Sequence, residues 1–294
     1  MVGKFRNYLK GLFLSSIVAL GIIFFSTNGL FFAPAISQPV NQLIIQGKTL
    51  YEAGKYLEAV EVLQQAADIY QSKQDNLKEA MTLSNLSLAY QQLGKWELAE
   101  NAIERCLKLI EAQEDLQLLA PALEIQASLQ FSRSQLQQAL ASWQRLAEIY
   151  SQTDRETKLI QSKLNAVAAM QGLGFYRQAE QTLTETNQLL QKQPNSPLKA
   201  EGLGNLGSVL RITGDLKDSR QILEQSLAIA RDFPNSSVLG NTLLALGKTA
   251  QAQQQIEVAL DFYRQADARS TSPRQKIQAQ LQQQSLLIKV EEYS

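Results

Sequence analysis

Three asparagines, Asn85, Asn165 and Asn205, are separated by multiples of forty residues. A carboxamide side chain both donates and accepts hydrogen bonds, so a row of them can pair with the main chain of an extended peptide whatever its sequence. The chemistry that this spacing indicates is noncovalent recognition. The same row would also arise if a repeat were duplicated and each asparagine bonded only to a neighbouring helix. The sequence leaves both interpretations open.

Residues suited to catalysis or metal binding are scarce in this chain. Histidine, the commonest general base and zinc ligand, is absent. Cys106 is the single cysteine, so no intramolecular disulfide or cysteine metal site is expected, and its place on an apolar helical face predicts an inert, buried thiol. The glycines between 202 and 207 do not follow a strand, which argues against a phosphate-binding loop. We therefore expect no enzyme activity, no cofactor and no metal.

The charge balance bears on the class of partner. The chain has 28 basic and 28 acidic residues, so it has no basic surplus to neutralise phosphates, and we do not expect nucleic acid as a partner. Hydrophobic residues make up 45% of the 294 positions, which is ample for a core. Gln, Leu and Ala are abundant, and these side chains, which are not branched at Cβ, favour helices.

The first 37 residues have the pattern of an export signal. Three basic residues precede an apolar run, small residues follow at 33–37, and no charge occurs between Lys10 and Lys48. This order predicts a cleaved secretory signal. The uncharged stretch is also long enough to span a bilayer, so an uncleaved inner-membrane anchor over residues 11–36 is the alternative. In either case we expect the remaining chain to be extracytoplasmic, either periplasmic or secreted.

The rest of the chain repeats every forty residues. One column is mostly glycine and comprises Gly54, Gly94, Ser134, Gly174, Gly214 and Gln254. Five residues later a column of small residues comprises Ala59, Ala99, Ala139, Ala179, Ser219 and Ala259. Clusters of turn-forming residues recur between the units. We predict six two-helix units near 40–79, 80–119, 120–159, 160–199, 200–239 and 240–279.

Each unit is predicted to be a pair of antiparallel helices. In the second unit, Leu83, Leu86 and Tyr90 recur at the spacing of one buried helical face. Such a pair cannot cover its apolar face alone and must stack on its neighbours, which gives a solenoid. Trp96 and Trp143 are expected in its core. A final amphipathic helix within 280–294 would cap the stack with a polar outer face.

The columns resemble the tetratricopeptide repeat (TPR). The residues of the second unit that carry the resemblance are Leu83, Leu86, Ser87, Tyr90, Gly94, Trp96, Ala99 and Ile103. The unit is longer than the usual 34 residues. The longer form is similar to kinesin-light-chain-type repeats and to the repeats that precede a caspase-like CHAT peptidase domain in bacterial proteins. The resemblance implies an all-α fold: a right-handed solenoid of about six TPR hairpins over residues 38–294, with an N-terminal hydrophobic helix before it.

The face of each first helix that packing does not use is where a ligand would bind. The resemblance implies that this face lines a concave groove for a protein or an extended peptide segment. The candidate groove residues are Lys48, Tyr51, Asn85, Gln91, Phe131, Asn165, Gln171, Asn205, Arg211 and Lys248. Apolar pockets would come from Phe131 together with Ile125, Leu164 and Leu244. Lysine is missing from the position at which other TPR domains clamp a C-terminal carboxylate, so no such clamp is expected.

Two functional hypotheses follow. The first is an exported, non-catalytic TPR scaffold that mediates protein–protein interaction through its groove and meets the membrane only through the N-terminal segment, if that is uncleaved. The alternative is the regulatory or recognition region of a CHAT peptidase-type protein whose catalytic half is absent from this chain. A reading frame that continues past Ser294 into a peptidase domain would favour the alternative. The partner, the pathway and the oligomeric state are not indicated by the sequence.

Overall fold

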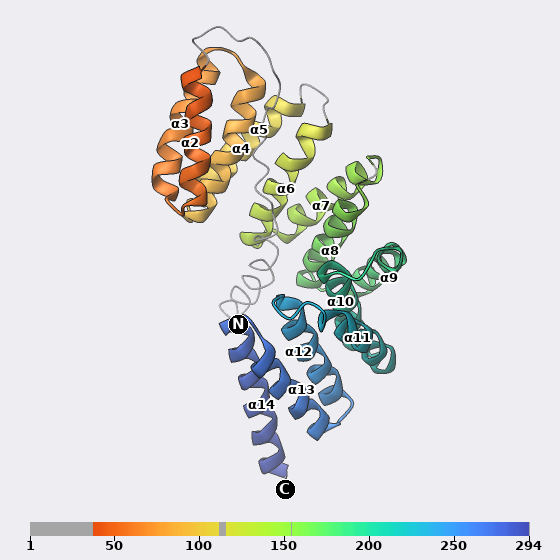
Figure 1. Cartoon of the computed structure of the whole chain (residues 1–294). Coiled ribbons are helices and arrows are strands. Elements are labelled where there is room, and N and C mark those ends of the chain that lie inside the picture. Colours follow the sequence, from red (N-terminus) through yellow and green to blue (C-terminus); the bar gives the residue numbers. More distant parts are fainter. Residues whose placement is uncertain (1–37, 112–115, 154, 294) are drawn as a thin grey trace. The chain divides into compact units, whose positions relative to one another are not determined.

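The computed structural model describes residues 38–111, 116–153 and 155–293, which form thirteen helices and no strand (Figure 1). The helices are α2 (Gln38–Glu52), α3 (Tyr56–Ser72), α4 (Asn76–Gln92), α5 (Trp96–Glu111), α6 (Leu116–Ser132), α7 (Leu136–Ser151), α8 (Glu156–Gly172), α9 (Tyr176–Lys192), α10 (Pro197–Thr213), α11 (Leu216–Ala230), α12 (Ser237–Ala252), α13 (Ile256–Arg269) and α14 (Pro273–Tyr293). The predicted all-helical fold is confirmed. The predicted export signal and hydrophobic helix lie outside the described residues.

The helices form six consecutive hairpins, α2–α3 to α12–α13, followed by α14. Each hairpin after the first begins a few residues ahead of its predicted repeat boundary, because the turn clusters cap the next first helix. The side chains of Ser196 and Ser236, for example, accept hydrogen bonds at the starts of α10 and α12. The chain divides between Ile149 and Tyr150, near the end of α7, into two compact units. No described helix has the length and apolar character needed to cross a membrane.

The turn inside every hairpin has the same backbone conformation. The turn residue has a left-handed φ in all six: Gly54 (75°), Gly94 (68°), Ser134 (62°), Gly174 (80°), Gly214 (100°) and Gln254 (61°). Glycine is favoured there because a Cβ resists positive φ. The two non-glycine members adopt the same angle, so the predicted forty-residue register holds throughout the described hairpins.

The two helices of a hairpin approach each other through the small-residue columns. All six members of the alanine column are 0% exposed. Seven residues before the turn, a Cβ added at Gly207 would lie 2.5 Å from the side chain of Leu223, and one at Gly247 would lie 2.4 Å from the ring of Tyr263. Neither position has room for a larger residue, because the interior is close-packed.

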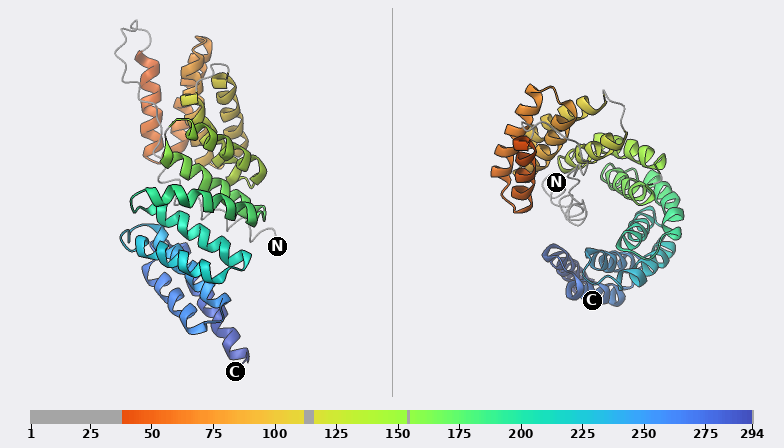
Figure 2. Two further views of the ribbon diagram at one scale, coloured as in Figure 1. Left: turned by 90° about the vertical axis from the view of Figure 1, so that its right-hand side faces the viewer. Right: turned by 45° about the horizontal axis from the view of Figure 1, so that its top comes forward.

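Successive hairpins stack chiefly through the second helix of one hairpin and the first helix of the next, as α3 does on α4 and α9 on α10. In the first unit α4 contacts α2 and α6, and in the second unit α10 contacts α8 and α12. The second helices of neighbouring hairpins have no comparable contact among the described helix pairs. Each unit therefore curves toward its first helices, which line its concave side. Figure 2 shows the hairpins of the second unit side by side.

Two expectations about large apolar side chains need correction. Trp143 is fully buried as predicted, but Trp96 is 39% exposed, because it is the first residue of α5 and has no preceding helical turn beside it. In α14 the buried Leu286 lies on the packed face, whereas Leu281 and Ile288 are 58% and 55% exposed. The outer face of this terminal helix is thus partly apolar rather than polar.

Candidate peptide-binding groove

Three glycines of α10 show which sides of this helix are packed. A Cβ added at Gly202 would meet α9 at 2.3 Å, one at Gly207 would meet α11 at 2.5 Å, and one at Gly204 would lie within 3.7 Å of both α11 and α12. At about 100° per residue, these directions span roughly 200° of the helix circumference. None of these three contacts points into the remaining sector.

Four residues occupy that sector, and we call them the concave strip of α10: Glu201, Asn205, Ser208 and Ile212. The first three are partly exposed, and Ile212 is 42% exposed. They lie on the side of the hairpin formed by the first helices, toward which the second unit curves. The predicted groove residue Asn205 is therefore accessible, and its role in binding remains a prediction.

The neighbouring first helices present polar and small residues at the same positions. In α8, Gln161 Nε2 donates a hydrogen bond to Asn165 Oδ1 over 3.3 Å, within one helix rather than across helices. In α12, Asn241 Oδ1 accepts a 2.7 Å bond from Gln275 Nε2 of α14. Lys248 lies on the same strip of α12, partly exposed. We use the name "second-unit groove" for these strips of α8, α10 and α12.

The predicted row that contains Arg211 lies elsewhere. By its phase, Arg211 lies between the directions of α11 and α12, and its Nε is buried without a hydrogen-bond partner among the described residues. Burial raises the pKa of Tyr263 in α13 to about 12, while the nearby Arg211 charge lowers it. The Tyr263 hydroxyl donates to Gln251 Oε1 over 2.8 Å. Arg211 and Gln251 thus lie between hairpins, and Gln171 has the corresponding position in α8.

In the first unit the predicted apolar and asparagine positions are largely covered. Asn85 is 6% exposed and Ile125 is 8% exposed. Phe131 is 1% exposed, and its ring centroid lies 5.2 Å from that of Trp143 on the partner helix. The expectation that Phe131 forms a groove pocket is therefore wrong: its phase directs it to the hairpin core. Leu164 and Leu244 of the second unit, 2% and 4% exposed, are core residues in the same way.

The other predicted groove residues of the first unit are partly exposed. Lys48 forms an ion pair with Glu52 at 3.8 Å. The Tyr51 hydroxyl accepts a 3.3 Å bond from Gln92 Nε2, and burial is the main cause that raises the Tyr51 pKa. Gln91 Nε2 is buried without a partner among the described residues. Lys48 and Tyr51 are thus held by contacts inside the first unit.

Sequence reasoning missed Glu201, the one acidic residue on the concave strip of α10. Its carboxylate forms no ion pair or hydrogen bond with the described residues, and burial alone raises its pKa to about 7. A single glutamate on a helix is usually solvated, so its residue type gave no warning. The signal that could have found Glu201 is its position in the repeat, because Gln161 and Asn241 occupy the same groove-facing position in the adjacent hairpins.

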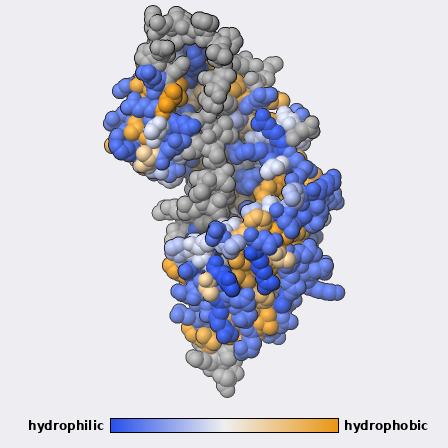
Figure 3. Space-filling model, in the orientation of Figure 1, coloured by the Kyte–Doolittle hydropathy of each residue, from blue (hydrophilic) through white to orange (hydrophobic). Residues whose placement is uncertain are grey.

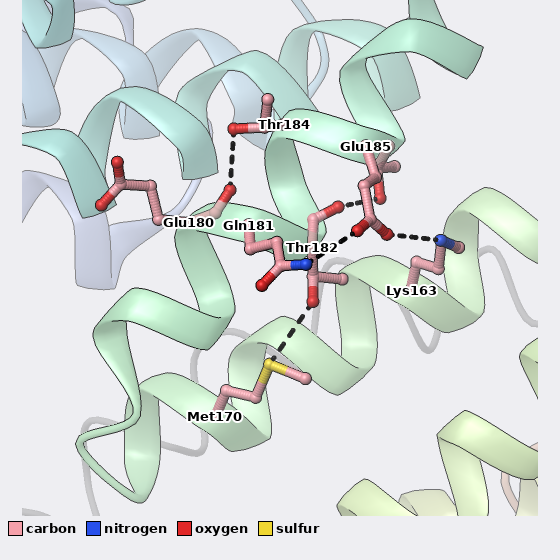
Figure 4. A network of polar contacts seen from close by, with 8 residues as sticks. Lys163, Met170, Glu180, Gln181, Thr182, Thr184 and Glu185 are labelled. Carbon is pink, nitrogen blue, oxygen red and sulfur yellow. Dashed lines mark hydrogen bonds and ion pairs between the residues drawn. The ribbon is translucent and has the colours of Figure 1, made fainter.

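The nearby cations are bound elsewhere. Lys163 Nζ lies 3.5 Å from Glu185 Oε2, in a network that joins α8 to α9 through Gln181, Glu185, Thr182 and Met170 (Figure 4). Lys199 Nζ donates to the Gln193 carbonyl over 3.1 Å. Neither lysine is paired with Glu201, in agreement with burial as the sole cause of its raised pKa.

Two features concern reactive groups among the described residues. Among the described residues no group of three or more Asp, Glu or Cys side chains is placed to hold a metal ion. Cys106 is fully buried as predicted, and burial raises its pKa to about 12, so its reactive thiolate form is suppressed. The visible surface mixes polar residues with smaller apolar areas (Figure 3).

Comparison with known proteins identifies the family to which these hairpins are similar. A family model described as "Tetratricopeptide repeat" matches residues 43–112, 159–232 and 198–269, more than half of the chain. No curated protein sequence matches the chain significantly.

Several solved structures share the fold at low sequence identity. Kinesin light chain-like TPR repeats of Podosopora anserina are 19% identical, with 69% of this chain and 99% of that one covered and a TM-score of 0.59. BtubC (BKLC) of P. vanneervenii is 20% identical, with 78% and 90% covered and a TM-score of 0.59. A Rap protein complexed with Competence and Sporulation Factor is 13% identical, with 85% and 74% covered and a TM-score of 0.53.

Proposed function

Because the chain belongs to the tetratricopeptide repeat family, whose members typically act as non-catalytic protein-binding scaffolds, we propose that its second-unit groove holds an extended segment of a partner protein. The observation that carries this proposal is the row of carboxamides that packing leaves uncovered. Asn165 and Asn205 are partly exposed, and neither bonds to a neighbouring helix in the described residues. Their amides are thus available to pair with a peptide main chain.

The size of the neighbouring side chains supports the same proposal. Ala168 and Ser208 lie one turn after the two asparagines and are small, so a peptide main chain can approach the helices closely. One structural neighbour, the Rap protein, was solved as a complex with Competence and Sporulation Factor. A curved stack of this type therefore can bind a partner, although that similarity concerns the fold alone.

Photo-crosslinking in the living cell tests the proposal. A photoreactive residue at Asn205 should capture a discrete partner, and Asn165→Ala in the same chain should reduce that capture about fivefold, the effect of losing one hydrogen bond. The matched control is Asn187 of α9, which lies in the layer of second helices. The proposal fails if Asn187 captures the same species equally, or if capture at Asn205 does not change with Asn165→Ala.

We infer further that the scaffold works outside the cytoplasm. The support is the order of basic, apolar and small residues before position 38. Protease added to cells with a permeabilised outer membrane should digest the hairpins of the full chain but not those of a chain lacking residues 1–37. N-terminal sequencing of the mature protein separates a cleaved signal from an anchor. Protection of the full chain would contradict the inferred location.

A further inference from the structure

The second-unit groove contains one carboxylate, that of Glu201, which takes no part in the packing of the helices. Glu201 is the one acidic side chain of a groove that otherwise carries amides, small residues, Ile212 and Lys248. It is partly buried and has no partner among the described residues. Carboxylates withdrawn from water are normally paired with a cation or with hydrogen-bond donors. The stability of the solenoid does not require an acid at this position, since Gln161 and Asn241 occupy it in the adjacent hairpins.

Three cations of the surrounding helices are held by other groups. Lys163 is paired with Glu185, and Lys199 bonds to a main-chain carbonyl. Arg220 of α11 is paired with Glu224, with Nε and Oε1 2.6 Å apart. Burial is the only cause of the raised Glu201 pKa, and no described residue forms an ion pair with its carboxylate.

The neighbouring strips carry amide oxygens, which are acceptors for a cation. Gln161 uses its Nε2 to bond Asn165, which leaves the carbonyl oxygen of Gln161 as an acceptor on the strip of α8. Asn205 lies one turn after Glu201 and offers a further acceptor. An ammonium or guanidinium group has only donors and needs several acceptors, of which a carboxylate is the strongest.

We propose that Glu201 binds a lysine or arginine side chain of the segment held in the second-unit groove, with amide oxygens of the adjacent strips as further acceptors. This rests on the proposed function, since it assigns a chemistry to one position of the peptide. The main-chain contacts of the asparagines would be sequence-independent. The contact with Glu201 would select a basic residue at a fixed distance from them.

A random twelve-residue peptide library displayed on phage tests this, with the full chain immobilised in detergent. Peptides selected by the native chain should share a basic residue at one aligned position. Replacing that residue by glutamine in a synthetic copy should weaken binding tenfold or more to the native chain, as expected for a charge-assisted hydrogen bond. The same replacement should change affinity less than about twofold for Glu201→Gln, because the two changes remove one interaction.

A reversed charge and a matched control sharpen the result. Glu201→Lys should select acidic residues at the aligned position, whereas Glu224→Gln, on the adjacent helix α11, should keep the basic preference. Circular dichroism of each variant establishes that it is folded. If selected peptides depend on Asn165 and Asn205 but show no basic preference, or keep it with Glu201→Gln, this inference is wrong and the proposed function stands. If no selected peptide depends on the two asparagines, both are wrong.

Discussion

Replacing Glu201 by glutamine should stabilise the protein at alkaline pH and leave its stability unchanged in acid. Burial raises the Glu201 pKa from 4.5 to about 7 in the folded chain, and unfolding returns it to its ordinary value. The folded state therefore holds this proton more tightly than the unfolded state does. The stability associated with it is fully present below about pH 4.5 and is lost as the pH rises through 7. Glutamine keeps the shape of the side chain and carries no charge to desolvate.

The size of the effect follows from the shift in pKa. Each pKa unit corresponds to about 1.36 kcal/mol, so the shift sets an upper limit of roughly 3 kcal/mol. Glu201 keeps some contact with solvent, which weakens the desolvation, and we expect about 1–2 kcal/mol at pH 8. For a cooperative unit of this size that is roughly 2–8 °C in the unfolding midpoint. At pH 4 the variant and the native chain should unfold within about 1 °C of each other.

Thermal unfolding of the full chain, followed by circular dichroism at pH 4 and pH 8, measures this difference. Glu224→Gln is the control, because Glu224 is more than half exposed and paired with Arg220. Losing that pair should destabilise the chain by less than about 1 kcal/mol at pH 8, the opposite sign. A Glu201→Gln gain of equal size at both pH values, or a loss at pH 8, would refute burial of the charge as the cause.

Three further predictions concern the hairpin core and its ends. Ala99→Leu should destabilise the second hairpin by about 1–3 kcal/mol, measured by urea unfolding, because Ala99 is 0% exposed between two helices. Leu286→Ala should cost about 2–4 kcal/mol, whereas Leu281→Ala on the exposed face of α14 should cost less than about 1 kcal/mol in the same assay. Cys106 should resist a thiol reagent at pH 8 until denaturant is added, because burial raises its pKa to about 12; rapid labelling of the folded chain would contradict this.

The features that were predicted correctly from the sequence are those that each hairpin repeats. A left-handed turn residue admits few residue types, and a close helix approach admits only small ones, so both constraints leave a column in the sequence. Ser134 and Gln254 show that the forty-residue register predicts the turn even where glycine is replaced, because both adopt the left-handed φ of the glycine turns. The helix pairs, the buried alanine column and the buried thiol followed from these columns.

The groove was harder to predict because its limits depend on neighbouring hairpins. A helical wheel of one helix assigned Phe131 and Arg211 to the free face together with Asn205. The structure narrows that face, because the next hairpin covers one side of it and the preceding hairpin covers the other. Arg211 consequently lies between hairpins. Phe131 is removed from the face for another reason, because it packs on Trp143 of its own hairpin. Comparison of the repeats draws attention to residues that recur, so it did not single out Glu201, which occurs in one unit only.

The positions at which the repeats differ are, for that reason, the ones that can set specificity. A residue shared by all units serves the packing that all units have, as the fully buried alanine column does. A residue that occurs in one unit only, on a strip that packing leaves uncovered, is not explained by the packing that all units share. Glu201 meets both conditions: the adjacent hairpins carry amides at its position, and it lies partly exposed on the concave strip of α10. Its charge is costly to bury, and no described cation pairs with it. The chain stays folded because the stability of the remaining hairpins exceeds the free-energy cost of burying this charge. A bound cation would lower that cost, because it would stabilise the charged form of Glu201.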